Sequence, residues 1–176
     1  MTLHGRRSAL LGSRIARLLS EVFPNLEVEE LLLIDALPTY LYNRFREQLR
    51  ADAVAMYLAE RYGGDSIVLG VTDMDGYVPG LNFVFGIAMP TIATAVVFLY
   101  RLATPNRDLF ESRVLKEVLH ELGHLFGLDH CSNPRCVMRF SNTVMEVNYK
   151  QAAFCRRCAE KLRLRGIEVS QEYVLP

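Results

Sequence analysis

Three of the four histidines of the chain lie in one short stretch with the pattern His-Glu-x-x-His-x-x-Gly-x-x-His. His120 and His124 are four residues apart, so on a helix both imidazoles project from one face and can bind the same metal ion. Gly127 can adopt the left-handed conformation that ends a helix, and the chain that follows can bring His130 back to the same ion. Three nitrogen ligands leave the fourth position of a tetrahedral zinc ion open, as in catalytic zinc sites.

Glu121 follows the first of these histidines and points away from the metal on a helix. A carboxylate in this place can hold a water molecule on the zinc ion instead of the ion itself. Zinc lowers the pKa of bound water to roughly 7 and polarises a peptide carbonyl, while the carboxylate takes the proton and passes it to the leaving amine. A lone histidine on a helix is usually a surface or core residue, but the complete pattern is improbable by chance. We therefore predict a zinc metallopeptidase with Glu121 as general base and acid.

All four cysteines follow this stretch, as the pairs Cys131-x4-Cys136 and Cys155-x2-Cys158. Two such pairs are typical of structural zinc sites, in which four thiolates close the coordination shell. Free buried thiols are the alternative, and in an oxidising compartment the same count would allow three disulfide pairings. Because Cys131 directly follows His130, one loop could supply ligands to both metals. The sequence thus predicts two zinc ions per chain, one catalytic and one structural.

Composition excludes several classes of protein. Twenty basic residues balance twenty acidic ones, so no net charge points to nucleic acid or to an anionic membrane. The N-terminus starts like a secretory signal, but Arg14 and Arg17 interrupt its apolar run. The most apolar run, residues 94–99, is far shorter than the roughly 20 residues that span a bilayer. We expect a protein of the cytoplasm without membrane or nucleic-acid partners, whose cysteines favour metal over disulfides.

Hydrophobic periodicity predicts an α+β fold, a mixed twisted sheet with helices packed on it. Length predicts a single domain, 1–176, in which residues 1–127 form the sheet and helices, including the histidine helix, and residues 128–176 form a small cysteine subdomain. The individual patterns predict helices over 8–22, over 41–61 and from Asn106 or Asp108 to Phe126, and strands over 26–34, 66–72, 83–88 and 94–102.

The histidine motif, Cys136-Val-Met138 and the four cysteines together resemble the archaemetzincins, a branch of the metzincin metallopeptidases with an additional four-cysteine zinc site. The resemblance includes residues 77–86 and 114–118 and covers roughly 66–165. It implies a zincin-like fold in which the three motif histidines bind the catalytic zinc, Glu121 is the base, and Met138 forms a turn beneath the site.

Met138 takes this role only from the resemblance, because a methionine is more often core filling and Met145 lies close by. The resemblance further implies that an edge strand within residues 82–102 pairs with an extended peptide substrate. Asp129 and Tyr149 are nearby candidates for orienting or oxyanion contacts, although such residues are more often structural.

Two functions fit this sequence. The first is a peptidase that acts on peptides or unfolded proteins. The second is a zinc-stabilised binding or structural protein whose histidine site is weakly loaded or inactive, since thiolates compete for zinc better than imidazoles do. Glu121 separates the two, because a binding module has no need of a carboxylate at that position.

Overall fold

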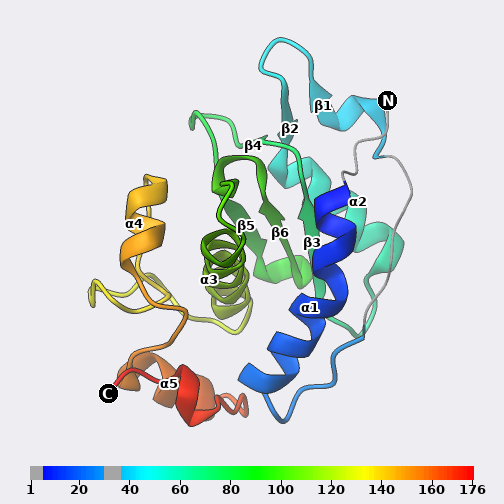
Figure 1. The fold of residues 1–176 in the computed structure, drawn as a ribbon. Helices are drawn as coiled ribbons and strands as arrows, with labels where there is room; N and C mark the ends of the chain where they lie inside the picture. Colours follow the sequence, from blue (N-terminus) through cyan, green and yellow to red (C-terminus); the bar gives the residue numbers. More distant parts are fainter. Residues whose placement is uncertain (1–5, 30–36) are drawn as a thin grey trace.

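The computed structural model describes residues 6–29 and 37–176, and its helices and strands form an α+β fold, as the sequence predicts (Figure 1). In chain order the elements are α1 (Arg6–Val22), η1 (Thr39–Leu41), β1 (Tyr42–Asn43), β2 (Gln48–Arg50), α2 (Ala51–Tyr62), β3 (Val68–Thr72), β4 (Gly76–Tyr77), β5 (Gly86–Met89), η2 (Pro90–Ile92), β6 (Thr94–Phe98), η3 (Tyr100–Leu102), α3 (Arg107–Leu125), α4 (Val144–Tyr149), α5 (Arg156–Arg163) and η4 (Gln171–Tyr173).

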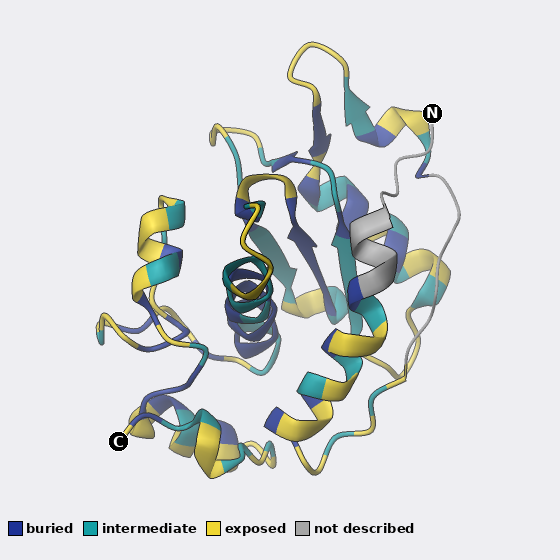
Figure 2. Ribbon diagram, in the orientation of Figure 1, coloured by how far each residue is buried: buried dark blue, intermediate teal, exposed yellow. Residues whose placement is uncertain are grey.

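The larger of two small mixed sheets has the strand order β3-β6-β5, with β3 parallel and β5 antiparallel to β6. Its central strand β6 is buried along its whole length, as Figure 2 shows. Val97 packs with α1 and α3, whereas Val96 and Phe98 pack with α2 on the other face. Burial on both faces explains why this strand is a continuous apolar run and not an alternating one.

The smaller sheet has the order β1-β2-β4. In it β1 is antiparallel to β2, and β2 is parallel to β4. A single bridge between Gly76 and Val84 connects β4 to the chain that enters β5. The smaller sheet therefore borders the approach to β5.

Within the described residues, every helix is too short or too polar to span a lipid bilayer.

The histidine helix α3 begins and ends as its sequence predicts. The Asn106 side chain accepts a hydrogen bond from the Leu109 N–H at 2.9 Å and caps the N-terminus. At the other end Gly127 has φ +84°, and the Leu128 N–H donates to Gly123 O at 2.9 Å. A residue with a side chain is strained in this left-handed conformation. The chain thus reverses at Gly127 and runs back along the helix.

Several of the predicted elements are wrong in part. The strand predicted over 94–102 ends at Phe98, and η3 follows it. Residues 42–50, predicted as the start of a helix over 41–61, form the β1–β2 hairpin, and only α2 is helical. The Asn43 side chain accepts the backbone N–H groups of Phe45 and Arg46, and Glu47 has φ 55°, so the chain turns where a helix would continue. The strand predicted over 26–34 is absent from residues 26–29, and the rest of it lies outside the described residues.

Candidate metal centres

The three motif histidines meet in space. His120 and His124 project from one face of α3, His130 comes from the reversed chain, and their ligand nitrogens lie within 4.8 Å of one another. The Nε2 atoms of His120 and His124 are 3.2 Å apart. Two nitrogens bound to one tetrahedral zinc ion at roughly 2.0–2.1 Å stand about 3.3–3.4 Å apart. The spacing of the imidazoles therefore fits a zinc ion.

Backbone carbonyls fix how two of these imidazoles are turned. His120 Nδ1 lies 2.9 Å from Val137 O, and His124 Nδ1 lies 2.8 Å from Leu128 O. A carbonyl oxygen can only accept, so both Nδ1 atoms carry the proton and both Nε2 atoms carry a lone pair. Two lone pairs at 3.2 Å repel each other unless a cation lies between them. The site is thus built for a metal ion, with the orienting hydrogen bonds that metal-ligating histidines usually make.

Burial also sets the charge of the histidines. It lowers the pKa of His120 well below its usual value, and the positive charge of Lys150 lowers that pKa further. Burial likewise lowers the pKa of His124 and of the more exposed His130. All three imidazoles are consequently held in the neutral form that binds metal.

Glu121 lies on the buried side of α3, against the first residue of β5. A Cβ atom added to Gly86 would stand 2.5 Å from Glu121 Oε1, so the carboxyl group occupies the space that any other residue's side chain would fill. Burial raises the pKa of Glu121 well above its usual value, and the neighbouring carboxylate of Glu117 raises it further. Lys150 acts in the opposite direction. The upward shift of the pKa makes this carboxylate a stronger proton acceptor than an ordinary glutamate.

A buried ion pair supports the same face of the helix. Lys150 Nζ lies 2.8 Å from Glu117 Oε1, and both side chains are almost fully buried. The same Nζ also donates to Arg139 O at 3.4 Å. Sequence reasoning missed both this pair and Gly86. The sequence does not distinguish a buried charged residue from one on the surface. For Gly86, the only signal was its position at the end of the 77–86 segment.

Met138 is fully buried beneath α3. A Cβ atom on Gly123 would stand 2.3 Å from Met138 Sδ, so the methionine packs on the helix between the two histidines. Met145, by contrast, is 69% exposed. Of the other candidates, Asp129 lines a surface hollow together with His124, whereas the exposed ring of Tyr149 lies 4.7 Å beneath the guanidinium of Arg135.

The four cysteines form a second cluster, with all sulfurs within 4.8 Å of one another. All four are buried, and none forms a disulfide. Cys131 Sγ and Cys155 Sγ are 3.7 Å apart. A disulfide would require about 2.05 Å, whereas two sulfurs on one tetrahedral zinc ion stand about 3.8 Å apart. The spacing fits a closed four-thiolate zinc site.

Hydrogen bonds favour the thiolate form at Cys136, whereas the contact with Cys136 raises the pKa of Cys158. The Cys158 thiol donates to Cys136 and lowers the pKa of Cys136 to about 5. Cys136 Sγ also accepts the Cys155 N–H at 3.3 Å, and Cys131 Sγ accepts the Asn133 N–H at 3.4 Å. Backbone donors of this kind stabilise negative charge on sulfur, which a metal-bound thiolate needs.

The sequence is similar to a peptidase family and to named archaeal proteins. The sequence model of peptidase family M54 matches residues 27–164. The chain is 51% identical over 117 residues to the archaemetzincin of Pyrobaculum aerophilum, covering 66% of this chain and 72% of that protein. It is 40% identical over 155 residues to the archaemetzincin of Archaeoglobus fulgidus, covering 87% and 94%.

Solved structures agree with these matches. The crystal structure of archaemetzincin from Methanopyrus kandleri superposes with a TM-score of 0.83 at 40% identity, covering 93% of this chain and 91% of that one. The malonate complex of the archaemetzincin from Archaeoglobus fulgidus gives 0.74 at 38% identity, covering 92% and 95%. A zinc-dependent peptidase from Methanocorpusculum labreanum gives 0.76 at 28% identity, covering 90% and 96%.

Proposed function

The chain belongs to peptidase family M54 and is a zinc metallopeptidase of the archaemetzincin kind, and from this premise we propose how its own residues hydrolyse a peptide bond. The imidazoles of His120, His124 and His130 hold the catalytic zinc ion through three nitrogens. Zinc bound there supplies a Lewis acid that polarises a peptide carbonyl and lowers the pKa of water to roughly 7. The observation that carries this assignment is the pair of proton-free Nε2 atoms that face each other at 3.2 Å.

Glu121 moves the proton in this proposal. Its carboxylate accepts a proton from the attacking water and then delivers it to the leaving amine, so no covalent intermediate with the enzyme forms. The raised pKa of Glu121 supports this role, because a carboxylate with a higher pKa accepts the proton of the attacking water more readily than an ordinary glutamate does. Contact with Gly86 holds the carboxyl group in one place.

The open edge of β5 provides the place for a peptide substrate. The Phe98 N–H donates to Phe85 O at 2.8 Å, and the strand register continues with Gly86 opposite Val97. Along an antiparallel pair, residues that hydrogen-bond to the partner strand alternate with residues that do not. Because Phe85 is hydrogen-bonded to β6, the backbone N–H and C=O groups of Gly86 and Ala88 point away from β6. Among the described strands, none pairs with this edge. An extended peptide can therefore add to β5 as another strand.

The cysteine cluster completes the proposal with a second, structural zinc ion, for a total of two per chain. Its four thiolates fill the coordination shell and leave no position for a substrate. Met138 packs beneath the histidine helix. We treat residues 1–176 as one domain in which 128–176 form a zinc-stabilised subdomain. Thiolates that bind metal need a reducing compartment, which supports a cytoplasmic location.

Glu121→Gln tests the proposal. The amide is close to the carboxylate in size but cannot take a proton, so we expect full zinc content and loss of cleavage by at least about a thousandfold. Zinc per chain, measured by mass spectrometry, and cleavage of a peptide library report the two properties separately. Wild-type cleavage by a zinc-loaded Glu121→Gln protein would reject the role of Glu121. A zinc-replete wild-type protein that cleaves no peptide would instead favour a zinc-stabilised binding protein.

A further inference from the structure

The segment between β4 and β5, residues 78–85, has no part in the chemistry described so far. We call it the rim segment. It leads straight into Gly86, which contacts Glu121, and its last residue Phe85 is buried and bonded to β6. Whatever fixes the rim segment therefore fixes the chain beside the catalytic carboxyl group and at the open edge of β5.

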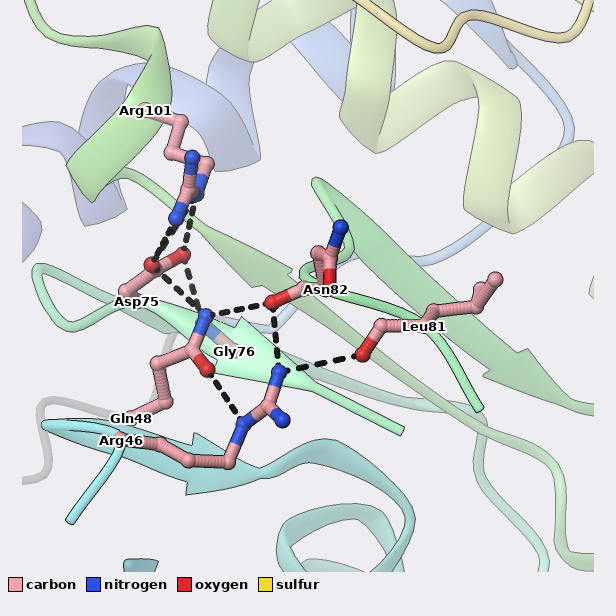
Figure 3. A network of polar contacts seen from close by, with 7 residues as sticks. All are labelled: Arg46, Gln48, Asp75, Gly76, Leu81, Asn82 and Arg101. Carbon is pink, nitrogen blue, oxygen red and sulfur yellow. Dashed lines mark hydrogen bonds and ion pairs between the residues drawn. The ribbon is translucent and has the colours of Figure 1, made fainter. Parts of the chain in front are cut away.

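A polar network centred on a buried carboxylate fixes this segment (Figure 3). Asp75 is 6% exposed and accepts hydrogen bonds from Arg101 Nε and Nη2 at 2.8–3.0 Å. Gln48 Nε2 donates both to Asp75 Oδ2 and to Asn82 O, each at 2.9 Å. The guanidinium of Arg101 also covers the ring of Phe83 at 4.1 Å. The network thus ties β2 and η3 to the middle of the rim segment.

Arg46, at the tip of the β1–β2 hairpin, anchors the rim segment from the other side. Its Nη2 donates to Leu81 O at 3.1 Å and to Asn82 O at 2.9 Å, and its Nε donates to Gln48 Oε1 at 2.8 Å. Asn43 Oδ1 accepts the N–H groups of Phe45 and Arg46, so the hairpin tip is fixed as well. Two neighbouring loop tips are consequently held in one arrangement (Figure 3).

These ordered tips present apolar side chains to solvent. Phe45 is 102% exposed and Leu81 is 52% exposed. Single exposed apolar residues are common, but these two stand on loops that the Arg46 side chain joins by its hydrogen bond to Leu81 O. The backbone carbonyl of Asn82 accepts two hydrogen bonds, from Arg46 and from Gln48. The Asn82 side chain makes no hydrogen bond to the described residues. A rigid backbone with free apolar and amide side chains loses little entropy when it binds an extended chain.

The direction of a bound peptide follows from β5. The C-terminal part of the strand lies beside the metal site, because Ala88 and Pro90 line a surface hollow together with His124. The N-terminal end of β5 leads back to the rim segment. Antiparallel pairing, the commoner kind, places the upstream half of the peptide at Ala88 and the downstream half at Gly86. Beyond Gly86 the bridge between Val84 and Gly76 occupies this edge, so the peptide has to leave β5 over the rim segment.

We propose that the rim formed by Phe45, Leu81 and Asn82 binds an apolar residue of the substrate downstream of the cleaved bond. Leu81 precedes Gly86 by five residues, so at about 3.3 Å per residue the contact falls within about five residues of that bond. The enzyme then prefers unfolded polypeptide that continues past the cleavage site over short peptides. This inference rests on the proposed function, because it uses the edge of β5 as the substrate site.

The test compares peptides of different length on the zinc-loaded enzyme. A bond that the wild type cleaves in denatured casein supplies a common core. One peptide ends two residues after that bond, one continues for six residues with a leucine, and one carries serine in place of the leucine. The proteins are the wild type, Phe45→Ser, Leu81→Ser and, as a matched control, Leu164→Ser. Leu164 is 72% exposed and follows α5, at the opposite end of the molecule from the β1–β2 hairpin (Figure 1).

We expect the wild type and the control to show a higher kcat/KM for the long leucine peptide than for the other two. Phe45→Ser and Leu81→Ser should each reduce the ratio of long to short kcat/KM about three- to tenfold, as loss of a half-buried apolar contact does. An unchanged ratio in both variants overturns the proposal.

A binding measurement separates this outcome from failure of the proposed function. Fluorescence anisotropy of the labelled long peptide is measured on zinc-loaded Glu121→Gln protein with and without the Phe45→Ser and Leu81→Ser changes. If the wild type cleaves peptides but these changes leave Kd as it was, only the rim proposal falls. If the wild type cleaves nothing, the hydrolytic function falls, and the Kd values still decide whether the rim binds an extended chain.

Discussion

Replacement of Gly86 by alanine should displace the Glu121 carboxyl group, which we propose as the general base, without changing its chemistry. The new Cβ atom would stand 2.5 Å from Glu121 Oε1, 2.6 Å from Cγ and 2.8 Å from Cδ. Ordinary contacts of this kind start at about 3.4 Å, so the carboxyl group must move by roughly 1 Å. The backbone of Gly86 is outside the left-handed region, and alanine is otherwise allowed there. The substitution therefore acts through the carboxyl group.

The size of the effect follows from that displacement. A misplacement of about 1 Å costs on the order of a hundredfold in rate, whereas overpacking costs about 1–3 kcal/mol in the free energy of unfolding. We expect Gly86→Ala to stay folded, to keep its zinc and to lose about a hundredfold in kcat. Peptide kinetics, zinc per chain and urea unfolding measure these three quantities on one preparation.

Gly70→Ala in β3 of the same sheet is the matched control, because its Cβ atom would stand 2.4 Å from Leu58 Cδ1 of α2. That contact is with the flexible end of an apolar side chain far from the metal site in sequence and packing, so stability should fall while kcat per bound zinc stays within about threefold. Two results would refute the reasoning. One is a zinc-loaded Gly86→Ala enzyme with nearly full activity, and the other is an equal loss of kcat in both variants.

Two further perturbations test the supports of the metal centres. Lys150→Met leaves Glu117 charged and buried, so it should lower the free energy of unfolding by about 3–5 kcal/mol. Adding Glu117→Gln should restore most of this loss. A double-mutant cycle measured by urea unfolding that shows no such coupling would contradict the buried ion pair. Cys155→Ser should weaken zinc binding at the histidines as well as at the thiolates. Zinc per chain and competition with a chelator measure this effect. Unchanged stoichiometry and affinity at the histidines would reject coupling of the two sites.

The histidine helix could be read from the sequence almost completely. Its cap at Asn106, its apolar face and its stop at Gly127 are local signals that act within a few residues. The histidine pair on this helix and the two cysteine pairs also follow local spacing rules, because residues a few positions apart in a helix or a tight loop can bind the same metal ion. Strands β3 and β6 were predicted for a similar reason, because runs of branched apolar residues indicate burial.

The hairpin at residues 42–50 could not be predicted in this way. Leu41, Phe45 and Leu49 are spaced as on a helix, yet Phe45 is fully exposed while Leu41 and Leu49 are buried. The turn depends on Asn43 and on Arg46, whose partners lie in the rim segment more than 30 residues away. Long-range pairing of this kind overrides local periodicity and leaves little trace in the sequence.

The chain from Gly127 to Met138 joins the two metal centres mechanically. Leu128 O and Val137 O hold the Nδ1 atoms of His124 and His120, and His130 is followed at once by a cysteine of the second cluster. The Cys131 N–H donates to Met138 O at 2.9 Å and closes this stretch into a loop. Loss of metal at the thiolates would free the same backbone that orients the imidazoles of His120 and His124 and carries His130. The structural zinc ion is therefore expected to control the affinity of the catalytic one, although it takes no part in the reaction.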